Sequence, residues 1–178
     1  VTVQNEPAAT QIWDSCIYTA SEERDFATDY LWPALQKAGH KDVKILAWDH
    51  NRDLIEERAD AYFSEKKAVN RIWGLGFHWY SGEDWKELSK VHDKYPDKPL
   101  IMTEACIEGG AKPGQWDRGE IYAKHIISDI NNWASGWIDW NMVLDMKGGP
   151  NHVGNYCDSP VLVNTDTGEV FFQSSYYY

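Results

Sequence analysis

The chain has 178 residues, of which 43% are hydrophobic and 25% charged, and its formal net charge is -11. This length and composition indicate a single globular domain with a sizeable core. The negative charge argues against nucleic-acid binding, which needs a basic face to neutralise phosphates. No apolar run approaches the ~20 residues of a transmembrane helix. The first residues, "VTVQNEP", show no signal peptide, which leaves the compartment open.

Two residue types give further hints about function. Ten tryptophans and ten tyrosines are more than a core of this size requires, and sugar rings stack on such side chains. The three cysteines, Cys16, Cys106 and Cys157, are an odd number at wide spacing. They form neither a disulfide framework nor a CxxC metal site. We expect each to be a small buried hydrophobe, and we expect no metal or cofactor.

The predicted elements begin with a strand in "VTVQ", residues 1–4, and a helix over 19–39. Thr19 is the expected N-cap of that helix, with Glu22 completing a capping box and Gly39 ending it. Pro33 predicts a kink or a break. Strands and helices then alternate along the chain. The strands are expected at 42–48, 72–80, 98–104 and 136–144, the helices at 53–65, 81–95 and 117–134, and a hairpin turning at "DTG" at 160–172.

This alternation predicts parallel strands with right-handed crossovers, in an α/β fold. An open doubly wound sheet would normally carry a glycine-rich phosphate turn after an early strand, and none is present. In a (β/α)8 TIM barrel, functional groups sit at the C-terminal ends of the strands. Polar residues recur at the expected strand ends: Asn5-Glu6, Asp49-His50-Asn51, His78-Tyr80, Glu104 and Asp139-Asn141. We therefore favour the barrel.

The predicted barrel is incomplete, because a whole one takes ~250 residues and eight strands. At most five strand–helix units are present here. Residues 1–178 are accordingly expected to be the C-terminal portion of a TIM-barrel catalytic domain, about strands 4 to 8, in a fragment of a longer chain.

Glu6 and Glu104 are the candidate catalytic pair. They are 98 residues apart, which is about three barrel units at ~31 residues each. Strands three apart lie nearly across the barrel mouth, and the geometry predicts carboxyl groups ~6 Å apart, close to the ~5–5.5 Å of retaining glycosidases. One glutamate would protonate the leaving oxygen while the other attacks the anomeric carbon. Alternatively, Glu104 caps a helix and Glu6 pairs with a lysine.

A set of ordered motifs resembles glycoside hydrolase family 30, and its glucosylceramidase branch in particular. The Asn-Glu-Pro triplet of "VTVQNEPAA" is similar to the acid/base strand of the wider clan of such enzymes. The other segments are "ASEERDFATDYLWPAL", "ILAWDHNRD", "GLGFHWYSG", "MTEAC", "WDRGEIYAKHIISDINNWASGWIDWNMVLDMKGGPNH" and "YCDSPVLVN". The resemblance covers nearly the whole chain. It implies that further barrel strands and a β-sandwich belong to the parent chain.

The resemblance assigns roles to single residues. It makes Glu6 the acid/base and Glu104 the nucleophile, while Asn5 contacts the sugar 2-hydroxyl and holds the nucleophile. Further glycone-pocket positions are His78, Tyr80, Trp140 and Asn151, and Asp49 and Asn51 match the loop after the fifth barrel strand. Each has a plainer interpretation as well. His78 alone would be a satisfied core histidine, Trp140 alone a packing residue, and Asn51 a helix N-cap.

The leading functional hypothesis is a cofactor-free retaining β-glycosidase that hydrolyses β-glucosides such as glucosylceramide or a β-glucan. A second hypothesis keeps this mechanism on xylan, β-1,6-glucan or a fucoside. A third is a barrel segment that binds carbohydrate without cleaving it. The expected partner is a carbohydrate or glycolipid, with no nucleic acid. Family members imply a secreted, periplasmic or lysosomal parent protein.

Overall fold

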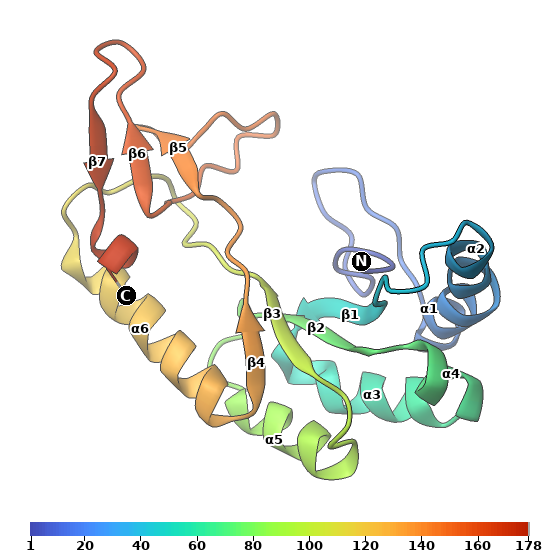
Figure 1. The fold of residues 1–178 in the computed structure, drawn as a ribbon. Coiled ribbons are helices and arrows are strands. Elements are labelled where there is room, and N and C mark those ends of the chain that lie inside the picture. The colour runs from blue at the N-terminus through green and yellow to red at the C-terminus, as the bar shows by residue number, and fades with distance from the viewer. Residues whose placement is uncertain (178) are drawn as a thin grey trace.

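The computed structural model describes residues 1–177, and a four-stranded parallel sheet forms its centre (Figure 1). The strands are β1 (Leu46–Asn51), β2 (Gly74–His78), β3 (Leu100–Glu104) and β4 (Ala134–Trp137). They lie in the order β1-β2-β3-β4, and every neighbouring pair is parallel. A doubly wound sheet reverses its strand order at a switch point, whereas a barrel wall keeps chain order. The observed order is that of a barrel wall.

Helices cover one side of this sheet, as expected for strand–helix units (Figure 1). These helices are α3 (Ile55–Phe63), α4 (Lys66–Arg71), α5 (Trp85–Lys94) and α6 (Trp116–Asn131), with a short 3-10 helix, Arg52–Leu54, before α3. Ile55 and Ala59 of α3 and Leu88 and Val91 of α5 are fully buried against strand residues such as Leu75. The core thus lies between sheet and helices, and it holds the strand ends in place.

The predicted strand at residues 1–4 is wrong in extent. Thr2 forms a single parallel bridge with Leu46, and the Val1 ammonium donates to the Lys44 carbonyl at 2.8 Å. The chain then bends, and Glu6 adopts a left-handed φ of 49°. Glu6 therefore lies in a bend after an isolated bridge and does not end a strand.

The predicted helix at 19–39 consists of three consecutive helical segments. They are α1 (Ala20–Asp25), a π-helix (Phe26–Leu31) and α2 (Trp32–Lys37). The capping box is confirmed, because the Glu22 N–H donates to the Thr19 hydroxyl and the Thr19 N–H donates to the Glu22 carboxylate. Gly39 follows the end with a φ of 87°. Pro33 is the second residue of α2 and directly follows the π-helix, which is the irregularity in this helical stretch.

Strand β1 runs four residues later than predicted. It starts at Leu46 and continues through Asn51. Trp48 and Asp49 have left-handed φ values of 76° and 51°, and the pairing register with β2 slips at this point. The irregularity lies where the apolar first half of the strand gives way to the polar residues Asp49, His50 and Asn51. Asp49 and Asn51 therefore belong to a strand, and their assignment to the loop after it was wrong.

The predicted strand at 136–144 is also wrong, because it joins two separate elements. β4 ends at Trp137, and β5 (Val143–Asp145) pairs in a second sheet with β6 (Val161–Val163) and β7 (Val170–Phe172). Between them, the N–H of Trp140 donates to the carbonyl of Ala105 at 3.0 Å, which draws the chain across the end of β3. The hairpin of β6 and β7 is confirmed, and the 3-10 helix Ser174–Tyr177 follows it.

Two of the three cysteines are buried as expected. Cys106 and Cys157 are enclosed, but Cys16 is exposed, so the prediction for Cys16 was wrong. Within residues 1–177, no helix has the length and apolar character needed to cross a membrane.

Candidate active site

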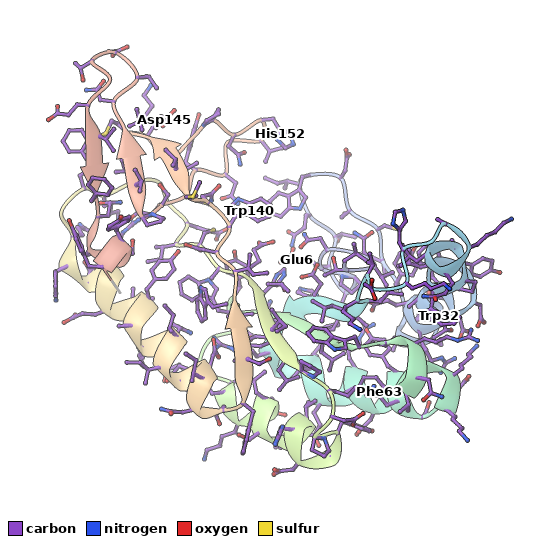
Figure 2. All side chains as sticks on the ribbon, in the orientation of Figure 1. Glu6, Trp32, Phe63, Trp140, Asp145 and His152 are labelled. Carbon is purple, nitrogen blue, oxygen red and sulfur yellow. The ribbon has the colours of Figure 1, made fainter. Side chains whose placement is uncertain are left out.

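A cavity of about 580 Å³ opens at the C-terminal ends of β1, β2 and β3. In Figure 2, Glu6, Trp140 and His152, which all line it, lie around the gap between the N-terminal loop and the tail that carries β5 to β7. The predicted site residues that line it are Asn5, Glu6, Asn51, Tyr80, Glu104, Trp140 and Asn151. The other two, Asp49 and His78, are buried and are not among the lining residues.

Glu6 and Glu104 face each other across this cavity. One carboxylate oxygen of Glu6, one of Glu104 and one ring nitrogen of His78 all lie within 4.8 Å of one another. Glu104 is the last residue of β3, and the N–H of Glu6 donates to the carbonyl of Asp49 at 3.0 Å. Glu104 caps no helix and Glu6 pairs with no lysine among the described residues, so neither alternative interpretation holds.

His78 lies beneath the two glutamates with a fully buried ring. Its Nε2 is 3.0 Å from Asp49 Oδ1 and 4.0 Å from Glu104 Oε2, and its Nδ1 is 3.5 Å from Glu6 Oε1. Burial disfavours the imidazolium, but the carboxylates of Asp49 and Glu6 outweigh it and raise the pKa of His78 to about 9. Glu6, His78 and Glu104 are close enough to hold a metal ion. A protonated His78 ring balances the charge of these carboxylates, and the ring would have to lose that proton to become a metal ligand.

The two glutamates have opposite pKa shifts. Burial alone would raise the pKa of Glu6, but the His78 ring nearby and a hydrogen bond from Gln11 hold that pKa below its usual value. Burial raises the pKa of Glu104, although His78 and the Tyr80 hydroxyl oppose the change. The surroundings of the two glutamates have thus shifted their pKa values in opposite directions, which is typical of acid/base pairs.

Asp49 contacts the site through the ring of His78. Its Oδ1 accepts a hydrogen bond from the Thr103 hydroxyl at 2.6 Å and faces His78 Nε2. Burial would raise the pKa of Asp49, but its bonds to His78 and Thr103 keep it lowered. The carboxylate therefore stays ionised and orients the ring of His78.

Tyr80 and Asn51 connect two strand ends. The Tyr80 hydroxyl donates to Glu104 Oε1 at 3.0 Å, and the Tyr80 N–H donates to Asn51 Oδ1 at 3.0 Å. Asn51 occupies the N-cap position of the 3-10 helix that follows it, as the plainer interpretation expected, but its side chain makes no capping hydrogen bond there. Its side chain holds the backbone that presents Tyr80.

The remaining predicted residues form the rim. Trp140 is 55% exposed and borders the cavity, so it is not a core packing residue. Asn151 Oδ1 accepts from the N–H groups of Val153 and Asn155 at 3.0 and 3.1 Å, which shapes its own loop. Asn5 lines the cavity beside Glu6.

Several functional neighbours were missed from sequence. Gln11 Nε2 donates to Glu6 Oε2 at 2.5 Å, from a loop whose sequence carries no periodic signal. Thr103 directly precedes Glu104, and alternation along a strand predicts that neighbouring side chains point to opposite faces. Cys106 and Cys157 also line the cavity, although their spacing gave no sign of a common location.

Sequential parallel strands with an acidic pair at the mouth are the features of a (β/α)8-barrel enzyme site. The glycosyl hydrolase family 30 TIM-barrel domain matches residues 1–178, and the chain belongs to this family. The family resemblance seen in the sequence is thereby confirmed, as is the partial barrel.

Known proteins of the family share this segment. The chain is 34% identical over 190 residues to the lysosomal acid glucosylceramidase of Mus musculus, covering 100% of this chain and 37% of that protein. The crystal structure of SrfJ from Salmonella typhimurium matches with a TM-score of 0.95 and 35% identity, over 99% of this chain and 40% of that one. The endo-β1,6-glucanase BT3312 matches with a TM-score of 0.86 and 32% identity, over 99% and 41%. The chain thus spans less than half the length of each.

Proposed function

We propose that residues 1–178 are the C-terminal part of the catalytic barrel of a retaining β-glycosidase that acts on β-glucosides. The remaining barrel strands and a β-sandwich would come from the rest of a longer chain. The observation that carries this proposal is the approach of the Glu6 and Glu104 oxygens to within 4.8 Å. Inverting enzymes separate their carboxyl groups by ~6.5–9.5 Å to admit a water, whereas retaining enzymes need only ~5–5.5 Å. The close approach supports direct attack by one carboxylate.

In the proposed mechanism, Glu104 attacks the anomeric carbon while Glu6 protonates the leaving oxygen. The first step breaks the glycosidic bond and forms a glycosyl ester on Glu104. Glu6, now ionised, then takes a proton from water, which hydrolyses the ester and restores both groups. The Tyr80 hydroxyl fixes the attacking carboxylate, and the His78 imidazolium offsets negative charge beneath the sugar.

The roles require a pKa order that substrate must help to establish. In the described residues alone, the pKa of Glu104 is raised and that of Glu6 is lowered, which is the reverse of what a nucleophile and an acid need. A sugar hydroxyl that donates to Glu104 lowers its pKa, and a leaving group that covers Glu6 raises its pKa. We therefore expect the high-pH limb of kcat, which reports the complex, to lie above that of kcat/KM, which reports the free enzyme.

The substrate proposed first is a glucosylceramide-like β-glucoside. The similarity to the lysosomal acid glucosylceramidase of mouse supports this substrate. The same similarity supports a lysosomal or secreted parent protein. A β-1,6-glucan is the second candidate, favoured by the likeness to the endo-β1,6-glucanase BT3312. Rates of the full-length enzyme on glucosylceramide and on a linear β-1,6-glucan separate the two. Tight binding of both with hydrolysis of neither would instead indicate a carbohydrate-binding barrel.

The test of the catalytic roles uses leaving-group dependence in the full-length enzyme. Glu104→Gln removes the nucleophile and should lower kcat/KM by about 10⁴-fold or more on every aryl β-glucoside. Glu6→Gln should be severely slowed with 4-methylumbelliferyl glucoside but should still release dinitrophenol in a burst from 2,4-dinitrophenyl glucoside, because that leaving group needs no proton.

Glu169→Gln is the matched control, since Glu169 is an exposed glutamate in the β6–β7 hairpin, and it should keep the unaltered rate. A burst from Glu104→Gln with none from Glu6→Gln would mean that the two roles are exchanged. Full activity of Glu104→Gln would refute the proposal.

A further inference from the structure

Two cysteines meet at the wall of the cavity, although 50 residues separate them in sequence. Cys106 Sγ lies 3.3 Å from Cys157 Sγ, and both side chains are buried. Both residues also line the cavity, so a small reagent in the cavity reaches this wall. Cys16, the third cysteine, is exposed and outside this cavity's lining.

The backbone fixes this pair from both sides. Glu108 and Cys157 form an antiparallel bridge, and the Asp158 N–H donates to the Ile107 carbonyl at 2.7 Å. The Cys157 N–H donates to the Gly148 carbonyl at 3.0 Å. The two chain segments are therefore held side by side. A disulfide bond is about 2.05 Å long, so the sulfur atoms must approach by roughly 1.3 Å, a movement within the reach of side-chain rotation.

We propose that Cys106 and Cys157 are a redox-active pair that forms an intrachain disulfide with a low-molecular-weight disulfide, such as oxidised glutathione, as the oxidant. The Cys157 thiolate attacks one sulfur of the oxidant, so that the S–S bond of the oxidant breaks, its other sulfur leaves as a thiol and a mixed disulfide forms on Cys157. Cys106 loses its proton and attacks that Cys157 sulfur, releasing the second thiol. Two protein S–H groups are lost, one S–S bond forms, and the oxidant is reduced to two thiols.

The environment of the pair sets the order of these steps. Hydrogen bonding from the Cys106 thiol lowers the pKa of Cys157, although burial opposes this, and the same contact raises the pKa of Cys106. Cys157 is thus the sulfur that ionises first and attacks the oxidant, since the thiolate is the nucleophile. A secreted or periplasmic parent protein would meet oxidants of this class.

The cross-link would lie next to the proposed nucleophile. The Tyr80 hydroxyl is 3.4 Å from Cys106 Sγ and donates to Glu104 at 3.0 Å. Closing the disulfide draws Cys106 Sγ toward Cys157. It also ties the end of β3 to the segment that precedes β6. The bond should therefore raise thermal stability and change the position of the Tyr80 hydroxyl relative to Glu104.

The test equilibrates the full-length enzyme in oxidised and reduced glutathione, traps free thiols by alkylation and maps the peptides by mass spectrometry. We expect a linked peptide pair containing Cys106 and Cys157 in the oxidised sample, its loss on adding dithiothreitol, and an oxidised Tm higher by about 2 °C or more. Cys157→Ser should abolish the linked pair and the Tm difference. Cys16→Ser is the matched control and should keep both.

Two results would overturn the proposal. One is complete alkylation of Cys106 and Cys157 in the oxidised sample. The other is a stable glutathione adduct on Cys157 with no linked pair. Because the peptide map is made on the unaltered protein, both readouts hold even if Cys157→Ser does not fold.

Discussion

Two clusters of charged and titratable side chains differ in what surrounds them. The mouth cluster consists of Glu6, Asp49, His78 and Glu104, and two of its members line the cavity. The helix cluster consists of Arg52, His125 and Asp129, and none of these lines that cavity. The mouth cluster combines three carboxylates with a histidine, and the helix cluster combines one carboxylate with a histidine and an arginine. Only the mouth cluster leaves charged atoms facing space that a substrate could fill.

The helix cluster holds the strand–helix layers together. The Arg52 guanidinium donates to the Asp129 carboxylate, to the Gly82 carbonyl at 2.7 Å, and lies 2.8 Å from His125 Nδ1. Arg52 and Asp129 are completely buried. The cluster thus joins the segment after β1 to α6.

The two histidines show what the difference means. Burial, followed by the charge of Arg52, lowers the pKa of His125 to about 4. Burial acts on His78 as well, but neighbouring carboxylates raise its pKa to about 9. A buried histidine with a shifted pKa is therefore not in itself a sign of a functional site. The excess of carboxylates next to a cavity distinguishes the mouth cluster.

The largest expected change in stability comes from breaking the helix cluster. Arg52→Ala leaves the Asp129 carboxylate buried without its partner, and it should destabilise the full-length enzyme by about 3–5 kcal/mol in urea unfolding. The kcat of the folded fraction should change little, since Arg52 does not reach the cavity.

The double variant Arg52→Leu with Asp129→Leu provides the control for this prediction. It removes both charges together and should recover most of the loss. If Arg52→Ala proved as stable as the unaltered enzyme, the helix cluster would not be a structural ion pair.

The mouth cluster should instead show a dependence on pH. The pKa of His78 in the folded protein, about 9, is above its usual value, so its stabilisation is complete below pH ~6.5 and is lost as pH rises through about 9. The full effect is about 3 kcal/mol. Urea unfolding between pH 6 and 9.5 should show this decline, and His78→Gln should flatten it and also slow turnover.

His40→Gln, at an exposed position, is the comparison for His78→Gln and should keep the decline. An equal slope in the His78→Gln variant would show that the imidazolium does not stabilise the fold, and the contrast between the two clusters would fail.

Much of the barrel wall was predictable because its signals are local. The apolar runs of β2 and β3, the capping box at Thr19 and the β6–β7 hairpin depend on residues close in sequence. The start of β1 and the break at 138–142 depend on partners elsewhere, such as the Ala105 carbonyl that binds the Trp140 N–H. Local patterns contain no trace of such partners.

The same limit applies to the site. Residues at the ends of predicted strands, such as Glu104, His78 and Tyr80, were placed together because parallel strands end at one edge. Gln11 comes from a loop, and Cys157 is held near Cys106 by an isolated bridge with Glu108. Their positions follow from tertiary structure. The catalytic roles of all of these residues stay predictions.

The smallest expected effect concerns Gln11, which sharpens the assignment of the proton donor in the mouth cluster. Its Nε2 donates to Glu6 Oε2 and helps to lower the pKa of Glu6. Gln11→Leu removes this donor, so the pKa of Glu6 should rise. If Glu6 is the acid, the high-pH limb of kcat/KM should move upward by about 1–2 pH units, because one hydrogen bond to a charged group contributes ~1.5–3 kcal/mol and one pH unit corresponds to about 1.4 kcal/mol. Gln36→Leu, on α2, should leave the profile unchanged. A fall in rate at every pH without movement of the limb would mean that Gln11 only packs against the cavity, and that the proton on Glu6 is controlled by His78 alone.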